Sequence, residues 1–539
     1  MRNTARKTQV KNIFAQQPKI NIPRSTFDRS NDRWHTFNVG ELVPIYVDEV
    51  LPGDTFKAEL NTFARLSTPL FPTMDSAYVD YHVFFVPNRL IWNNWQRFMG
   101  EQNDPNDSIN FLVPVVNTLQ ILPEQWFKTN TIYDDMGYPT KLVGTSWNLP
   151  NNLAARAVNL VWNQWYRDQN FQQSKTVDLD DGPDNPNNYQ TRPLRNKRSD
   201  YFTSALPTAQ KFSTNGVPVF PQIPIISNNQ AIQFSGISPN TNTNVNLRLN
   251  NGLDTTTWSA NATGGSSAAR FGSQTGLEGN MALNTVNVLR QAMQLQQFLE
   301  TDNRGGTRYI ELIRAHFNVI NPDYRLQRPE FIYGKTVPLN ITPVANTANS
   351  TGQLSGFGTT SSQNHFIKSF TEHGILLVFA SARLNQSYQN SLDKMHMRST
   401  RYDYYWPEFS HLGEQVIKKI EMQGDPSQPI AVNEAGWGWQ ERYAEYRYKN
   451  NLIANQFKSA AFITNGLGSL SAWHYAEELA SPVTLNGTFI SCAGQRTTMD
   501  RTLSVSSSVA PQIIHNTFIK LECTRPMPVH GIPQSLLRL

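Results

Sequence analysis

Residues 55–66 read TFKAELNTFARL, and this stretch decides the fold class. Apolar residues at positions 56, 58 and 60 alternate with polar residues at 57, 59 and 61. A period of two places successive side chains on opposite faces, which is typical of a strand with one face buried. The sequence therefore predicts a half-buried β-strand here.

Other segments show similar strand signals, separated by long connections. Strands are predicted at 42–47, 78–86, 374–382, 415–422, 443–449 and 517–523, with a Ser- and Thr-rich edge strand at 502–509. Apolar residues at three- and four-residue steps predict helices at 152–168, 281–300 and 308–317. Irregular connections of this length do not fit the regular strand–helix–strand alternation of an α/β fold. The pattern therefore favours a mainly β, antiparallel sandwich with large insertions.

Composition excludes several classes of protein. Of 539 residues, 39% are hydrophobic and 17% charged, both below the usual globular shares of about 45–50% and 25%. No apolar run approaches the ~18 residues of a membrane span, so no membrane insertion is predicted. The N-terminus lacks the apolar segment of a secretory signal. Cys492 and Cys523 are therefore expected to be reduced, buried small hydrophobes.

Positive charge is concentrated at the N-terminus. Residues 1–33 carry eight Lys and Arg and two Asp, a net charge of +6, whereas the whole chain has +5. A basic segment on a near-neutral body favours a polyanion partner, usually nucleic acid, and a solvated terminus is the alternative. We predict a basic arm over residues 1–35, with DNA contacts by Arg2, Arg6, Lys7, Lys11, Lys19 and Arg24.

Residues 214–280 differ in composition from the rest of the chain. Only four of these 67 residues are charged, and Asn, Thr, Ser and Gly dominate. Such a segment buries little apolar area, so we expect a surface excursion. Its few aromatic residues favour some packing over full disorder.

The sequence carries no recognisable catalytic or metal-binding motif. It has no closely spaced histidine pair, phosphate-binding loop or nucleophile elbow, so no enzyme activity and no cofactor are predicted. The acidic segment 178–184 departs from the spacing of a calcium loop, and a solvated acidic loop is the simpler interpretation. His474 is expected to be a hydrogen-bonded structural histidine.

Two basic segments could contact either DNA or a neighbouring subunit. The segment RYAEYRYK at 442–449, if it is a strand, places Arg442, Tyr446 and Tyr448 on one face and Arg447 on the other. Tyrosines beside cations suit single-stranded nucleic acid and also suit subunit contacts. The segment RPLRNKR at 192–198 is the densest basic run in the body and supplies Arg192, Arg195, Lys197 and Arg198.

Several long strings resemble one family. They include RSTFDRS at 24–30, DEVLPGDTF at 48–56, TPLFPTMDSAYVDYHVFFVPNRLIWNNW at 68–95, GWGWQERYAEYRYK at 436–449 and RPMPVHGIP at 525–533. In order and nearly throughout, the chain resembles the major capsid protein of the gokushoviruses, small single-stranded DNA phages of the Microviridae. Residues 214–280 carry no motif of that family, which has a hypervariable insertion there.

The resemblance implies an eight-stranded antiparallel jelly roll with very long loops, formed by residues 36–213 and 281–539. It further implies a T=1 shell of sixty copies, a virion component assembled in the host cytoplasm around circular single-stranded DNA. It allows a small basic DNA-binding virion protein as a further partner. The insertion would form a threefold protrusion that meets a host receptor, and its candidate contacts are Phe234, Asn242, Asn244, Arg248, Asn250, Trp258 and Phe271.

Two other classes of protein would account for part of the composition. A β-sandwich that binds or hydrolyses carbohydrate would suit the Asn, Trp and Tyr content, but it leaves the basic arm without a role. A DNA-processing enzyme would need metal-binding histidines or a phosphate loop, and the sequence shows neither.

Overall fold

The computed structural model describes residues 23–116, 127–140, 150–211, 327–345 and 354–530 apart from 465 and 480. It also describes seven short strands between 225 and 279 and the helical stretches 286–306 and 309–318. The chain divides into two units, one of Met1–Ala209 with Asn321–Leu539 and the other of Gln210–Ile320. Each unit is described by itself.

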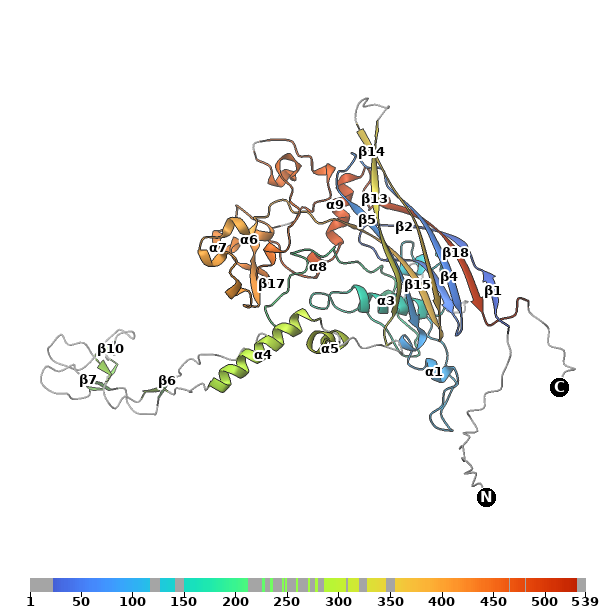
Figure 1. Cartoon of the computed structure of the whole chain (residues 1–539), viewed down its shortest axis with the longest axis horizontal. Coiled ribbons are helices and arrows are strands. Elements are labelled where there is room, and N and C mark those ends of the chain that lie inside the picture. The colour runs from blue at the N-terminus through green and yellow to red at the C-terminus, as the bar shows by residue number, and fades with distance from the viewer. Residues whose placement is uncertain are drawn as a thin grey trace, which may run out of the picture. The chain divides into compact units, whose positions relative to one another are not determined.

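A curled antiparallel sheet dominates the first unit (Figure 1). Its strand order is β1-β18-β4-β14-β13-β5-β15-β3, and β2 also pairs with β18. The strands are β1 (Ser25–Asp28), β2 (Asn31–Phe37), β3 (Val43–Val50), β4 (Thr55–Leu66), β5 (Ala77–Pro87), β13 (Glu330–Ala345), β14 (Leu354–Ser369), β15 (Gly374–Leu384) and β18 (Ile513–Arg525). Because β1 and β2 pair with different parts of β18, they fill one edge position and leave eight strand positions in all.

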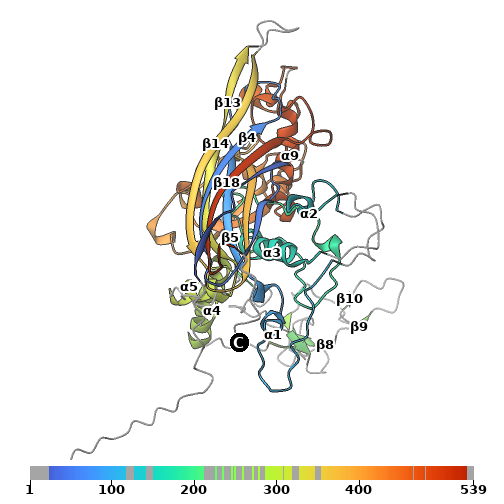
Figure 2. The same cartoon turned by 90° about the vertical axis from the view of Figure 1, so that its right-hand side faces the viewer.

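The sheet curls into a half-barrel because β13 belongs to both of its layers. The first part of β13 pairs with β5, and its last residues, Asn340–Ala345, pair with β14. Figure 2 shows β13, β14, β4 and β18 side by side. Between the layers lies the main core, which includes Phe56 and Leu60 of β4, Leu521 of β18 and Val79 and Tyr81 of β5. The mainly β, antiparallel fold is therefore confirmed and fits a jelly-roll β-sandwich.

The two layers are buried differently. Strand β15 is buried along nearly its whole length, because loops and helix α3 (Leu153–Val161) cover its second face. Phe379 of β15 and Phe84 of β5 pack there against Val158 and Trp162. Strands β4, β18 and β14 instead alternate between buried and less buried residues, so their outer face is open to solvent.

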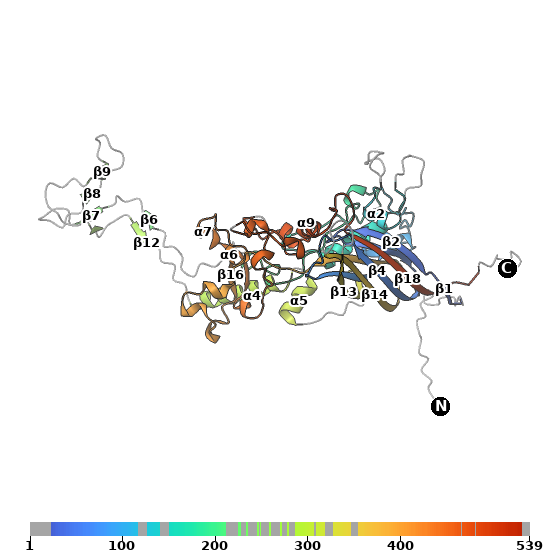
Figure 3. The same ribbon diagram turned by 90° about the horizontal axis from the view of Figure 1, so that it is seen from above.

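Long connections carry the remaining elements of the first unit. These are α1 (Trp95–Phe98), α2 (Ile132–Asp135), β16 (Glu414–Lys418), α6 (Lys419–Met422), α7 (Ile430–Asn433), β17 (Gly436–Glu441), α8 (Gly487–Ile490) and α9 (Ala493–Thr502). Seen from above, β1, β18, β4 and β14 run side by side (Figure 3). Among the described residues, no helix has both the length and the apolar character to cross a membrane.

The second unit contains the whole low-charge segment, residues 214–280. Its short strands are β6 (Ile225–Ser227), β7 (Gln233–Ser235), β8 (Val245–Asn246), β9 (Arg248–Leu249), β10 (Trp258–Ser259), β11 (Arg270–Phe271) and β12 (Leu277–Gly279), followed by α4 (Val286–Arg304) and α5 (Tyr309–Phe317). His316 of α5 lies 2.7 Å from Asp302 and stacks on Phe298 of α4, which joins the two helices.

Several local predictions are corrected. Residues 415–422 form a strand only as far as Lys418 and then turn into α6, while 443–449 is a turn with one short 3-10 helix. Residues 502–509 are the end of α9 and a series of turns rather than an edge strand. The described part of the predicted arm, residues 23–35, contributes β1 and part of β2 to the sheet.

Candidate assembly and DNA-facing surfaces

The basic run 192–198 lies mostly inside the first unit. The side chains of Arg192, Arg195 and Lys197 are buried, and Arg198 is half-buried against the ring of Tyr78. Burying a cation is costly unless a carboxylate and further hydrogen bonds compensate for lost hydration. Each of the three buried cations has such a partner.

Arg192 joins two distant segments. Its Nε and Nη2 donate to the two carboxylate oxygens of Asp135 at 2.8 and 2.5 Å, and its Nη1 donates to Glu41 at 2.9 Å. Arg496 of α9 also pairs with Glu41. This cluster ties the loop before β3, helix α2 and helix α9 together.

Arg195 belongs to a second buried cluster centred on Asp80 of β5. The Asp80 carboxylate lies 3.4 Å from Arg195 and 2.6 Å from Arg383 of β15. Burial raises the pKa of Asp80, but the attraction of Arg383 and Arg195 outweighs burial, so the pKa is lowered overall. Asp80 is therefore an anion that holds two guanidinium groups against the sheet.

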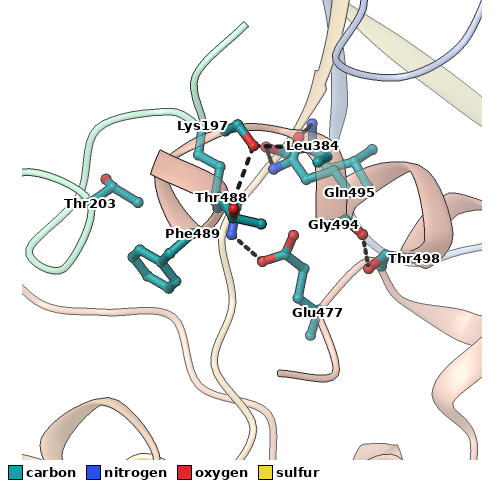
Figure 4. A network of polar contacts seen from close by, with 12 residues as sticks. Lys197, Thr203, Leu384, Glu477, Thr488, Phe489, Gly494, Gln495 and Thr498 are labelled. Atoms are coloured by element: carbon teal, nitrogen blue, oxygen red, sulfur yellow. Dashed lines mark hydrogen bonds and ion pairs between the residues drawn. The ribbon is translucent and has the colours of Figure 1, made fainter. Parts of the chain in front are cut away.

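Lys197 forms the third pair, shown in Figure 4 with its surroundings. Its ammonium group pairs with Glu477 and lies 4.5 Å from the centre of the Phe489 ring. Nearby, Gln495 and Leu384 are joined by hydrogen bonds of 3.1 and 3.2 Å. A cavity of about 750 Å³ beside this pair is lined by Lys197, Glu477 and Arg501 among others.

These placements correct the expectation of a surface contact for Arg192, Arg195 and Lys197. The three side chains stabilise the packing of long loops on the sheet and are not available to phosphate on the surface of the chain. A dense basic run looks the same in sequence whether it faces solvent or compensates buried carboxylates, because the partners lie far away along the chain.

The acidic segment 178–184 is also bound within the chain. Asp184 and Asp180 pair with Arg156 of α3, and Asp181 accepts hydrogen bonds from Trp92 and Asn94. Among the described residues, no group of three or more His, Cys, Asp or Glu side chains could hold a metal ion. The segment is therefore a loop held against the rest of the first unit, and it is not fully solvated as expected.

The segment 442–449 contributes to an exposed aromatic surface rather than to a strand. Tyr443, two residues after the end of β17, adopts a left-handed conformation with φ of 62°, and the chain then enters the 3-10 helix Ala444–Tyr446. A left-handed residue interrupts a strand, so the predicted alternation of faces does not occur. Tyr446 and Tyr448 are nevertheless about half-exposed, and their contact with DNA or a neighbouring subunit stays a prediction.

A second aromatic run, YDYYW at 402–406, lies against this segment. The Tyr405 ring is 5.0 Å from Tyr443 and 6.2 Å from Tyr446, and the Tyr443 hydroxyl donates to the Tyr404 carbonyl at 3.2 Å. The aromatic surface comprises the exposed side chains Tyr402, Tyr404, Tyr405, Trp406, Tyr446 and Tyr448. Sequence reasoning missed its first half, although five residues with four aromatics were a visible signal.

Charges on the aromatic surface are largely compensated inside the chain. Residues 393–412 and 441–449 together contain six Lys and Arg and five Asp and Glu. Arg398 pairs with Glu445 at 3.2 Å and lies over the Tyr446 ring, while Arg447 pairs with Glu441 and Lys449 with Asp393. Arg442 lies over the Tyr443 ring. The surface therefore offers aromatic area with little net charge.

The other predicted site residues fall in different places. Arg24 is exposed at the start of β1, where it donates to Thr55 at 3.2 Å, and Arg2, Arg6, Lys7, Lys11 and Lys19 lie outside the described residues. In the second unit Phe234, Arg248, Trp258 and Phe271 belong to short strands, and Asn242, Asn244 and Asn250 lie outside the described residues.

The predicted structural roles of three residues are confirmed. His474 is buried, accepts a hydrogen bond from the Ala476 amide at 3.0 Å and contacts the Phe457 carbonyl. Cys492 and Cys523 are free and buried. Burial raises the pKa of the Cys492 thiol to about 12.

A jelly-roll body with long loops fixed by buried ion pairs and an exposed aromatic surface fits a structural protein of the viral shell class. The comparisons agree: the family described as capsid protein (F protein) of phages matches residues 15–535, and the chain belongs to this family. Its residues therefore build a component of the virion, and its role is structural rather than catalytic.

The chain is similar over almost its whole length to three capsid proteins named VP1. It is 39% identical to that of Bdellovibrio phage phiMH2K, covering 97% of this chain and 98% of the relative. It is 35% identical to that of Chlamydia phage 1, with the same coverage, and 30% identical to that of Spiroplasma virus 4, covering 95% of each. The predicted resemblance to Microviridae capsid proteins is confirmed, and the carbohydrate-binding alternative loses its support.

Proposed function

We propose that sixty copies of this chain assemble into a T=1 shell that encloses circular single-stranded DNA and attaches to a bacterial host through residues 214–280. The observation that carries the assembly step is the aromatic surface, because three of its cations are paired with carboxylates within each copy. Such a surface can be buried against another protein at a lower desolvation cost than one whose charges are unpaired. Tyr and Trp are also the residues that contribute most to protein interfaces.

The basic N-terminal segment supports the enclosure of DNA. Residues 1–22 contain five Lys and Arg and no Asp or Glu. Cations that neutralise phosphates release condensed counterions, which favours binding at low salt. A small basic virion protein would neutralise DNA phosphates in the same way.

The weakly charged insertion supports host attachment, since many copies on one shell make weak single contacts sufficient. Assembly would take place in the host cytoplasm.

Particle formation tests the proposal. Purified chain should form hollow particles of uniform size under electron microscopy, and it should protect single-stranded DNA from nuclease. The double variant Tyr404→Ser, Tyr448→Ser should lower the fraction of assembled chain at least several-fold, without changing the melting temperature of the dissociated subunit. The matched variant Tyr404→Phe, Tyr448→Phe keeps the aromatic area and should assemble normally. Normal assembly of the serine variant would show that the aromatic surface is not part of the interface between copies.

A further inference from the structure

A pocket beside the aromatic surface contains an arginine whose charge is not compensated. Arg442 directly follows β17, and its guanidinium lies 4.6 Å from the centre of the Tyr443 ring. Among the described residues, this guanidinium has no ion-pair or hydrogen-bond partner, and its Nε is shielded from solvent. Arg398, Arg447 and Lys449 pair with carboxylates of the same chain. Arg442 is therefore available to a carboxylate from outside the subunit.

The cavity around this arginine, which we call the Arg442 pocket, has a volume of about 340 Å³ and is also lined by Arg398 and Trp439. Sites that enclose small molecules measure roughly 300–1,000 Å³, so the pocket can admit side chains of a partner protein. The Arg398 side chain is 9% exposed, and its Nε, like that of Arg442, has no hydrogen-bond partner in the described part of the chain. Two guanidinium groups with unused donors favour a carboxylate or a phosphate.

The pocket's own carboxylates are held elsewhere. Those that line it are Asp403, Glu414, Glu421 and Glu445. Glu445 pairs with Arg398 at 3.2 Å, and Glu421 lies 3.7 Å from Lys394. Asp403 accepts hydrogen bonds from the amides of Ser399 and Thr400 at 3.0 and 2.7 Å. None of the four forms an ion pair with Arg442.

Assembly through the aromatic surface, as proposed above, takes Arg442 out of water. A buried cation without a counter-ion is costly, because it loses hydration and gains no attraction in return. The neighbouring copy therefore has to present a carboxylate at the Arg442 pocket. The segment that supplies it must be exposed, acidic and unpaired within its own copy, and it must bring apolar side chains to the surrounding rings.

The loop 101–112 meets these requirements. It carries three acids, Glu101, Asp104 and Asp107, and no Lys or Arg. Nearly all of its residues are exposed, and the exposed fractions reach 82% for Leu112 and 48% for Ile109. The loop thus offers carboxylates together with aliphatic side chains, which complements an unpaired arginine beside exposed rings.

Hydrogen bonds give this loop a fixed shape. The Asp107 carboxylate accepts from the amides of Asn103 and Asp104 at 3.2 Å each, and the Asp107 amide donates to the Asp104 carbonyl at 3.0 Å. The Gln102 side chain donates to the Asp107 carbonyl at 2.8 Å. Asp107 is therefore used within the turn, whereas the Asp104 carboxylate has no partner among the described residues. A loop that is already ordered loses little conformational entropy when it docks.

We propose that loop 101–112 of one copy docks on the aromatic surface of the next, with the Asp104 carboxylate in the Arg442 pocket and Ile109 and Leu112 against the exposed tyrosines. This inference rests on the proposed assembly and names the segment that covers the surface. The loop follows α1 and the pocket lies beside β17, in a different part of the first unit (Figure 1). The contact therefore joins two different patches of neighbouring copies, the head-to-tail arrangement that closes into rings.

A charge exchange tests the docking. Arg442→Glu and Asp104→Arg should each raise the subunit concentration needed for particle assembly, measured by light scattering, at least about tenfold, because each places like charges together. The double variant should return to within a few-fold of the wild type, since the pair is restored with its polarity reversed. The melting temperature of the dissociated subunit should not change, because neither side chain has an ion-pair partner in its own copy.

The matched control is Asp32→Arg, which makes the same charge change at an exposed position of β2 and should assemble like the wild type. An equal loss of assembly in this control would trace the effect to net charge and overturn the proposal. Failure of the double variant to recover would also overturn it, because the loop and the pocket would then have different partners.

Two further outcomes separate the docking from the proposed function. If Tyr404→Ser, Tyr448→Ser blocks assembly while Arg442→Glu and Asp104→Arg assemble normally, the aromatic surface is an interface but loop 101–112 does not cover it. If Arg442→Gln lowers the affinity of dissociated subunits for a fluorescent oligothymidylate, the pocket holds phosphate and the docking is wrong. If the wild-type chain forms no particles, the proposed assembly itself fails.

Discussion

The guanidinium of Arg156 and the carboxylate of Asp184 face each other in a two-pronged contact inside the first unit. Nε lies 2.7 Å from one carboxylate oxygen and Nη2 lies 2.5 Å from the other, and the side chains are 0% and 1% exposed. Nη1 of the same guanidinium donates to the carbonyls of Ile91 and Asp180 at 3.0 and 2.9 Å. One side chain of α3 therefore fixes two loops that the sequence places far apart.

Replacing Asp184 by Asn should lower the free energy of unfolding of the subunit by about 3–5 kcal/mol, because it leaves a buried guanidinium without its counter-ion. Denaturant unfolding of dissociated subunits measures this. Asp180→Asn is the control: Asp180 also pairs with Arg156, but its side chain is 76% exposed, so the expected loss is below about 1 kcal/mol. Equal losses of unfolding free energy in the two variants would contradict the conclusion that Asp184 is the buried counter-ion of Arg156.

Replacing Lys197 by Met should impair folding rather than DNA binding. The variant leaves Glu477 buried without its cation, so the melting temperature of the subunit should fall. The folded fraction should bind oligothymidylate with the wild-type slope of log affinity against log salt, because Lys197 is buried. Arg24→Ala, at an exposed position within the predicted arm, should show the reverse: little change in stability and a smaller slope of log affinity against log salt. A smaller slope of log DNA affinity against log salt for Lys197→Met would show that Lys197 does contact phosphate.

Acid should destabilise the subunit through its buried histidines. Burial lowers the pKa of His515 to about 3 and that of His82 to about 4, from an ordinary value of 6.5. Between pH 6.5 and about 4 the unfolded chain therefore binds more protons than the folded one. The free energy of unfolding should fall with pH in this window, by up to about 1.4 kcal/mol per pH unit for each histidine.

The variant His515→Gln separates this effect from the titration of carboxylates. Its amide can still contact the Tyr81 hydroxyl, which lies 3.0 Å from His515, but it cannot take up a proton. Its stability should depend less steeply on pH than that of the wild type in urea unfolding between pH 7 and 4. Identical pH profiles would show that His515 does not contribute.

The two thiols should be unreactive until the chain unfolds. Cys492 and Cys523 are both fully buried, and burial raises both thiol pKa values, so little thiolate forms near neutral pH. An aromatic disulfide reagent should detect no thiol in the native subunit and two after denaturation. Rapid reaction of one native thiol would show that its part of the core opens.

Periodicity in the sequence predicted several of the strands, including one that is half-buried and one that is buried along nearly its whole length. Residues 55–66 form β4 with the predicted ends, and residues 374–382 lie within β15. The long hairpin of β13 and β14 was missed, because Gly, Pro, Ser and Thr interrupt its apolar pattern. Its regularity comes from pairing with neighbours rather than from local propensity.

The functional surfaces were less predictable because they depend on contacts between distant residues. Nothing local distinguishes Arg195, which faces Asp80 in the interior, from a solvent-exposed arginine. Arg398 and Arg442 lie far apart in the sequence, and only the folded chain brings them to one pocket. The excess of basic residues at the N-terminus is visible from charge alone, but its role as an arm stays a prediction, and residues 25–28 and 31–35 belong to the sheet.

Ser25 and Arg525, paired across β1 and β18, are 500 positions apart in the chain. A ribosome must therefore synthesise nearly the whole polypeptide before β4 gains its neighbour and the sheet is completed. Until then β4 presents an unpaired edge, which is the feature that makes nascent β-proteins prone to aggregate and dependent on chaperones. A truncated translation product that ends before β18 keeps this open edge of β4 and also leaves β1 and β2 without a partner.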